Sequence, residues 1–143
     1  MRHAGSMALC IDKITGSRER NPMGNCLKVG ILGAGNIAGS MAEALNELQK
    51  EGKACAYAVA SRSQEKALEF ARKWNITRAY SSYEELASDP EVDLIYIATP
   101  HSLHYEQAKL CMEHGKNVLV EKAFTANARQ AEELFAMAEE KRV

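Results

Sequence analysis

The 143-residue sequence lacks several features that would identify specialised classes of protein. It has no run of about 18 apolar residues, so we expect no transmembrane helix. Its 18 basic and 19 acidic side chains leave a net charge of −1, which argues against a nucleic-acid-binding surface or a polybasic membrane patch. It also has no internal repeat and no low-complexity tract. The remaining composition, 46% hydrophobic and 26% charged, is typical of one ordinary globular domain.

The cysteines lack the close spacing that zinc sites use, so no metal site is predicted. They are Cys10, Cys26, Cys55 and Cys111. Cys55 lies in an apolar run and Cys111 in a helical pattern. We therefore expect buried or partly buried free thiols in a reducing compartment, and we place the protein in the cytoplasm. Residues 1–26 have no apolar segment of the kind found in secretory signals and are predicted to be a flexible leader.

From residue 27 onward, short apolar runs alternate with longer segments of helical periodicity. Strands are predicted at 27–32, 54–60, 78–82, 93–99 and 117–121. Helices are predicted at 36–50, after the N-cap Ser63, from the N-cap Ser82 to about Asp89, at 103–114 with Gly115 after its end, and after the N-cap Asn127. This alternation predicts a doubly wound parallel sheet, a Rossmann fold. The six-stranded form needs another strand after the last helix, so the domain at 27–143 is expected to be truncated.

The apolar periodicity also predicts which face of each helix is buried. In helix 36–50 the predicted inward residues are Ile37, Met41, Leu45 and Leu48. In the helix after Ser63 they are Ala67, Phe70, Ala71 and Trp74. In the last helix they are Ala131, Leu134, Phe135 and Ala138.

Residues 33–38 read Gly-Ala-Gly-Asn-Ile-Ala, the G-x-G-x-x-A form of the dinucleotide-binding fingerprint. Gly33 permits a tight turn, Gly35 lets the backbone approach a pyrophosphate, and Ala38 lets the helix pack close to the strand. The amides at the start of helix 36–50 would point at the phosphates. Glycines also mark ordinary turns, but this motif follows an apolar strand and opens an amphipathic helix. A dinucleotide cofactor is therefore predicted.

The end of the second strand indicates which nicotinamide cofactor is preferred. NAD-binding domains usually place an acidic residue there to bind the ribose 2′-hydroxyl, but none occurs between Glu51 and Glu65. The strand instead leads into Ser61-Arg62-Ser63, whose guanidinium and hydroxyls suit a 2′-phosphate. NADP is favoured over NAD. The alternative is that Arg62 is a solvated surface residue and Ser63 only an N-cap.

Two further strand ends carry candidate site residues, because ligands of open parallel sheets bind beyond the carboxyl ends of the strands. Thr99, His101 and His104 follow the fourth strand, and Pro100 breaks it. His104 could donate to a ribose or nicotinamide group, or could be a structural residue.

Glu121 and Lys122 follow the fifth strand and could be either a solvated charge pair or a pair that faces a ligand and takes part in function. In the second case the Lys122 ammonium would polarise a substrate hydroxyl or carbonyl, or assist proton transfer.

Four motifs occur in a specific order: GILGAGNIA (30–38), AVASRS (58–63), IATPHSLHYEQA (97–108) and GKNVLVEKAFTAN (115–127). In this order they resemble the N-terminal domain of the glucose–fructose oxidoreductase / inositol dehydrogenase (Gfo/Idh/MocA) family, particularly its NADP-dependent dihydrodiol and sugar dehydrogenase branches. The resemblance implies NAD(P)-dependent oxidation or reduction of a small hydroxy or carbonyl substrate.

The resemblance also implies roles for individual residues. The pyrophosphate would be held by Gly33, Gly35, Asn36, Ile37 and Ala38, and the adenosine ribose by Ser61 and Arg62. The cofactor cleft would be lined by Thr99, Pro100 and His104. Glu121 and Lys122 match the family's Glu-Lys-Pro motif, in which the lysine contacts cofactor and substrate and supports catalysis.

The sequence departs from the family pattern in two places. Ala123 replaces a proline that is often preceded by a cis bond in relatives. A cis bond before alanine costs about 3–4 kcal/mol, so either this bond is trans and Lys122 is aimed differently, or strain is kept for function. The family's C-terminal domain, which supplies an acid/base histidine and contacts for a homo-oligomer, is absent. We therefore predict the NADP-binding domain of an oxidoreductase; the alternatives are a non-enzymatic NADP-binding sensor or regulator and an inactive truncated isoform.

Overall fold

The computed structural model describes residues 26–143, so the predicted leader lies outside the described residues except for Cys26. The strands are β1 (Leu27–Leu32), β2 (Ala54–Ala60), β3 (Arg78–Tyr80), β4 (Leu94–Ile97) and β5 (Asn117–Val120). The helices are α2 (Asn36–Lys50), α3 (Gln64–Trp74), α4 (Tyr83–Ser88), the 3-10 helix η1 (His101–Leu103), α5 (His104–Glu113) and α6 (Ala128–Lys141). All neighbouring strands pair in parallel, in the order β3-β2-β1-β4-β5. The predicted Rossmann-like sheet is confirmed.

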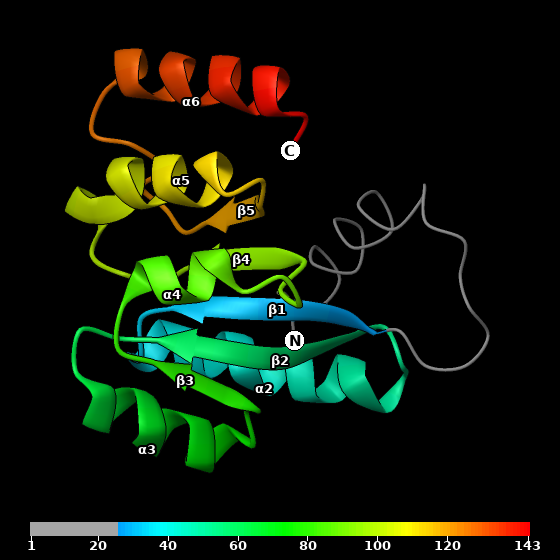
Figure 1. The fold of residues 1–143 in the computed structure, drawn as a ribbon. Coiled ribbons are helices and arrows are strands. Elements are labelled where there is room, and N and C mark those ends of the chain that lie inside the picture. The colour runs from blue at the N-terminus through cyan, green and yellow to red at the C-terminus, as the bar shows by residue number, and fades with distance from the viewer. Residues whose placement is uncertain (1–25) are drawn as a thin grey trace.

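Helices cover both faces of the sheet (Figure 1). Helices α2 and α3 pack on one face, where their apolar side chains join those of β1, β2 and β4 in one buried cluster. Helices α4 and α5 pack on the other face and contribute to a second cluster. Helix α6 lies against α5, and Leu134 is its buried contact. The strands are continuous in apolar residues because both faces are buried.

The predicted helix boundaries depend on local capping, and the structure confirms the caps. The side chains of Ser63, Ser82 and Asn127 each accept a hydrogen bond from the backbone N–H three residues later. Gly115 has a φ of +70° after α5, and the N–H of Lys116 donates to the carbonyl of Cys111. This is the glycine-terminated helix end that the sequence predicts.

Several predicted details were wrong. Ile37 is 55% exposed because it lies in the first turn of α2, at the sheet edge, where no strand side chain covers it. Phe135 is 62% exposed and packs beside Phe124, with ring centroids 5.5 Å apart. Because α6 contacts mainly one neighbouring helix, only a narrow face around Leu134 is buried. The third, fourth and fifth strands are also shorter than predicted, since their last residues, and Asp93 at the start of the fourth, lie outside the strands.

Within the described residues no group of three or more His, Cys, Asp or Glu side chains is placed to hold a metal ion. Cys26, Cys55 and Cys111 are free thiols, partly or fully buried, as predicted. No helix between residues 26 and 143 is long and apolar enough to cross a membrane.

Candidate functional site

The turn after β1 is built around Gly33. Its N–H donates to the carbonyl of Ala60 at 2.9 Å, which ties the turn to the end of β2. Its φ is +103°, and a Cβ at this position would lie 3.0 Å from the carbonyl oxygen of Ala98. A side chain here would therefore be strained and would push against the end of β4. The turn, as predicted, requires glycine.

The start of α2 is open toward the carboxyl edge of the sheet. Gly35 is the N-cap, in an extended conformation, and no side chain caps the helix. The first amides of α2, beginning with Asn36 and Ile37, have no partner within the helix. A Cβ on Gly35 would meet no atom within 4 Å, whereas Ala38 is completely buried. Free amides in front of an unobstructed backbone fit the phosphates of a dinucleotide.

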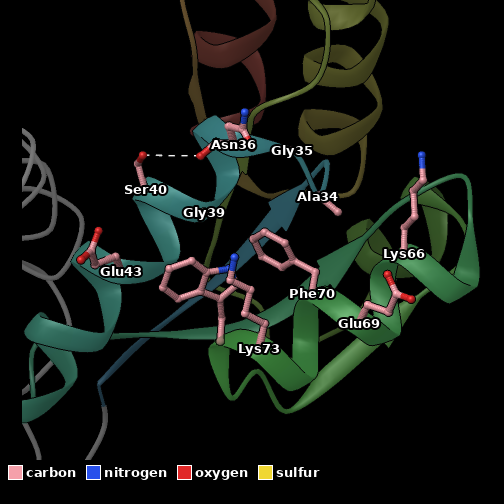
Figure 2. A pocket seen from close by; sticks show the side chains of 11 residues that line it. Ala34, Gly35, Asn36, Gly39, Ser40, Glu43, Lys66, Glu69, Phe70 and Lys73 are labelled. Carbon is pink, nitrogen blue, oxygen red and sulfur yellow. Dashed lines mark hydrogen bonds between the residues drawn. The ribbon is translucent and has the colours of Figure 1, made fainter.

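A pocket of about 540 Å³ extends from this helix start along the groove between α2 and α3 (Figure 2). It is lined by Ala34, Gly35, Asn36, Gly39, Ser40, Glu43, Lys66, Glu69, Phe70, Lys73 and Trp74. Its volume is in the usual range for small-ligand sites. Figure 2 shows the Lys66 side chain extended toward the end where Gly35 and Asn36 lie. The pocket includes no residue of β4 or β5 and neither Ser61 nor Arg62; of the predicted site residues it contains only Gly35 and Asn36.

Two cations lie at the N-terminus of α3. Arg62 is exposed and has no ion-pair partner among residues 26–143. Ser61 is half-buried, and its hydroxyl lies 3.4 Å from the N–H of Ser63. Lys66, which the sequence reasoning missed, is one turn further along the helix and is also exposed. The sequence pattern could have identified Lys66, because a lysine three residues after an N-cap lies at the same helix end as an arginine that precedes the N-cap.

Thr99 and Pro100 connect β4 to η1. Thr99 is buried beside the glycine turn, and its hydroxyl donates to the side-chain oxygen of Gln107, another residue that the sequence reasoning missed. Pro100 is exposed at the N-cap of η1, next to the exposed His101. The Thr99 side chain therefore stabilises the loop between β4 and η1. Of the two residues, only Pro100 is exposed enough to contact a ligand.

His104 is 1% exposed and links two loops. Its Nε2 lies 2.8 Å from the carbonyl oxygen of Thr99, and its Nδ1 lies 2.7 Å from the carbonyl oxygen of Ala123. Each ring nitrogen thus faces a backbone acceptor, and neither is directed at the cleft. This arrangement replaces the expected donation from His104 to a ribose or nicotinamide: His104 holds the end of β4 to the segment after β5.

Replacing His104 by alanine is expected to lower the free energy of unfolding by about 2–4 kcal/mol, because the carbonyl that accepts from the ring N–H loses its donor and a buried ring is removed. The matched control is His114→Ala, since His114 also contacts a carbonyl, that of Leu110 at 2.9 Å, but is exposed. Its effect should stay within about 0.5 kcal/mol. Urea unfolding of both variants measures the difference, and equal effects would contradict the bridging role.

Glu121 and Lys122 do not form an ion pair with each other. The hydroxyl of Tyr96 in β4 donates to Glu121 Oε1 at 2.5 Å, and the pKa of Tyr96 is raised by burial and by this hydrogen bond. The sequence reasoning missed Tyr96, although a tyrosine in a buried strand needs a partner for its hydroxyl. The Lys122 side chain is exposed and has no ion-pair partner within residues 26–143. The Lys122–Ala123 peptide bond is cis.

The carboxyl ends of the strands bring most of the predicted residues to one edge of the sheet. The glycine turn follows β1, Ser61 and Arg62 follow β2, Thr99 follows β4, and Lys122 follows β5. Because β1 is the neighbour of both β2 and β4, the glycine turn lies between the two cations of α3 and the segment that carries Lys122. A dinucleotide can extend across this edge.

Comparison with known proteins gives the same description. The sequence model of the Gfo/Idh/MocA group, described as an oxidoreductase family with an NAD-binding Rossmann fold, matches residues 27–143. The trans-1,2-dihydrobenzene-1,2-diol dehydrogenase of Xenopus tropicalis is 43% identical over 111 residues, which cover 78% of this chain and 33% of the relative. The D-xylose 1-dehydrogenase (NADP(+)) of Hypocrea jecorina is 38% identical over 126 residues, covering 82% and 32%.

A solved structure extends the similarity to the fold. The 3-ketoreductase KijD10 of Actinomadura kijaniata, in complex with NADP, matches with a TM-score of 0.74 and 34% identity. The match covers 82% of this chain and 36% of KijD10. This chain spans about a third of the length of the curated relatives that it matches.

Proposed function

Because this chain belongs to the Gfo/Idh/MocA oxidoreductase family, of which residues 27–143 form the NAD-binding Rossmann domain, we propose that it binds NADP(H) in preference to NAD(H). The observation that carries the proposal is the open, uncapped start of α2 beside two exposed cations, Arg62 and Lys66, at the start of α3. Relatives whose names include NADP, and the NADP complex of KijD10, support it.

Different residues bind different parts of the cofactor. The amides of Gly35, Asn36 and Ile37 bind the pyrophosphate, helped by the positive end of the α2 dipole. Arg62 and Lys66 bind the 2′-phosphate, because a dianion at a helix N-terminus is stabilised by adjacent cations. Ser61 offers a hydroxyl to the adenosine ribose. Glu43 and Glu69 lie farther along the pocket and oppose the binding of a second anion there.

Beyond the glycine turn, the proposed substrate is a small hydroxy or carbonyl compound such as a sugar, polyol or dihydrodiol. Bound nicotinamide would supply the hydride chemistry. Lys122 Nζ is the group of this chain that holds or moves the proton at the substrate oxygen. Glu121, fixed by Tyr96, anchors the backbone from which Lys122 extends. Thr99 and His104 position the neighbouring loops.

Replacing Arg62 by alanine is expected to weaken NADPH binding about 10- to 100-fold and to change NADH binding less than about threefold, since a charge-assisted contact to phosphate contributes roughly 1.5–3 kcal/mol. Lys66→Ala should act in the same direction with a smaller effect. The matched control is Lys73→Ala, because Lys73 lines the same pocket near the far end of α3 and should leave both affinities unchanged.

Calorimetric titration of each variant with NADPH and NADH measures these affinities. Equal loss of NADPH and NADH affinity in Arg62→Ala would show that Arg62 does not read the 2′-phosphate. An effect of Lys73→Ala as large as that of Lys66→Ala would place the phosphate elsewhere in the pocket.

A further inference from the structure

A pair of thiols lies at the end of the sheet opposite the candidate site. The Sγ atoms of Cys26 and Cys55 are 2.9 Å apart, although the two residues are 29 positions apart in the sequence. Cys26 directly precedes β1, and Cys55 is the second residue of β2. A disulfide needs the sulfurs at about 2.05 Å, so the two sulfurs would have to approach each other by a further distance of about 0.9 Å.

The strand pairing holds the two thiols in this position. Leu27 pairs with Ala54 and Lys28 with Cys55, so β1 and β2 are in register immediately beside Cys26. The N–H of Leu27 donates to the carbonyl of Lys53 at 3.0 Å. The contact between the two sulfurs is therefore held in place by the hydrogen-bonded start of the β1–β2 pair and not by a long loop.

The two thiols differ in accessibility. Cys26 is partly exposed, whereas Cys55 is 9% exposed. Burial, followed by the contact with Cys26, raises the pKa of Cys55 to about 12. The nearby Lys28 ammonium acts in the opposite direction, and Asp93 raises the pKa of Cys55 further. Cys26 is thus the thiol that an oxidant meets first, whereas the raised pKa of Cys55 means that Cys55 must lose its proton as it attacks.

We propose that Cys26 and Cys55 form a redox-sensitive pair that peroxide converts to a disulfide joining the starts of β1 and β2. The Cys26 sulfur attacks one oxygen of the peroxide, whose O–O bond breaks, giving a sulfenic acid and one water. The Cys55 sulfur then attacks the Cys26 sulfur and displaces a second water as the S–S bond forms. The two thiols lose two electrons and two protons, and both electrons reduce the peroxide. A dithiol reductant reverses the reaction.

The disulfide would enclose β1, the glycine turn and α2 in one covalent loop. Restricting the unfolded chain in this way is expected to raise the unfolding temperature by roughly 5–15 °C. The thiols lie at the amino ends of β1 and β2, whereas Gly33 and Gly35 follow the carboxyl end of β1. We therefore expect the affinity for NADPH to change less than about twofold on oxidation. This inference is independent of the proposed function.

The test treats the whole chain with hydrogen peroxide, blocks the remaining thiols and maps the cross-linked peptides by mass spectrometry. The expected main product joins Cys26 to Cys55, with a mass two hydrogens below the sum of the two reduced peptides. The rise in unfolding temperature should disappear with dithiothreitol. Both effects should persist in the control variants Cys10→Ala and Cys111→Ala and be absent in Cys26→Ala and Cys55→Ala.

Any other main product overturns the proposal. A disulfide that involves Cys10 or Cys111, or a sulfinic acid on Cys26 with Cys55 still reduced, would show that the pair does not close. A cross-link with no change in unfolding temperature would show that it does not restrain the β1–β2 unit. The peptide map is obtained from the wild-type chain, so a variant that folds poorly does not change which disulfide is found.

Discussion

Replacing Lys122 by methionine is expected to lower kcat at least about 100-fold, because a positioned proton donor or acceptor contributes roughly 10²- to 10⁴-fold to a rate. Methionine keeps an unbranched side chain, one atom shorter than that of lysine, and removes its charge. Lys122 is exposed on the segment after β5 and is not engaged in an ion pair with Glu121. The ammonium is therefore available for a substrate oxygen, and its removal should leave NADPH affinity within about threefold.

The measurement is NADP-linked turnover of sugars, polyols and dihydrodiols, followed by NADPH absorbance in a form of the protein that turns over one of them. Lys141→Met is the control, since Lys141 is an exposed lysine at the end of α6, a helix that packs against α5 and carries none of the predicted site residues. Unchanged kcat in Lys122→Met, with the fold intact, would return Lys122 to the role of a solvated strand-end residue.

Replacing Gly35 by serine is expected to lower NADPH affinity at least about 100-fold while stability stays the same or rises slightly. Serine is a favourable N-cap residue, and a Cβ at this position meets no atom within 4 Å. The new hydroxyl would cap the free amides of α2 and stand where the pyrophosphate approaches. The variant therefore separates ligand binding from folding, which few glycine substitutions do.

Gly33→Ala provides the contrast, because its Cβ would lie 3.0 Å from the carbonyl of Ala98 at a φ of +103°. It should lose both affinity and about 1–3 kcal/mol of stability. Thermal unfolding and NADPH titration of the two variants measure both quantities. If Gly35→Ser binds NADPH as tightly as the unchanged chain, the pyrophosphate does not lie at the start of α2.

The sequence alone was sufficient to predict the type of most helices and strands and their order along the chain. Strand–helix alternation and local capping residues such as Ser63 and Asn127 are properties of short segments, and the structure confirms them. The family resemblance is confirmed as well. The exposure of Ile37 and Phe135 was not predictable from periodicity, because periodicity identifies an apolar face but not whether a neighbour covers it.

The parts of the candidate site that could be predicted are those formed by residues adjacent in the sequence. The glycine turn and the Ser61–Arg62 segment could be read directly from residue types and their spacing. The contacts of His104 with Thr99 and Ala123, and of Tyr96 with Glu121, join residues from different strand ends. Such contacts depend on the lateral order of strands and on side-chain directions, which a single sequence does not specify.

The most direct test of cofactor binding at the start of α2 is the mapping of amide NMR shifts in ¹⁵N-labelled protein titrated with NADPH. We expect one-to-one binding, with the largest changes at Gly35, Asn36 and Ile37 and a second group at Arg62 and Lys66. NADH should shift the first group and leave the second nearly unchanged. Absence of binding, or changes centred on α4 and α5, would contradict the claim that the start of α2 holds the cofactor.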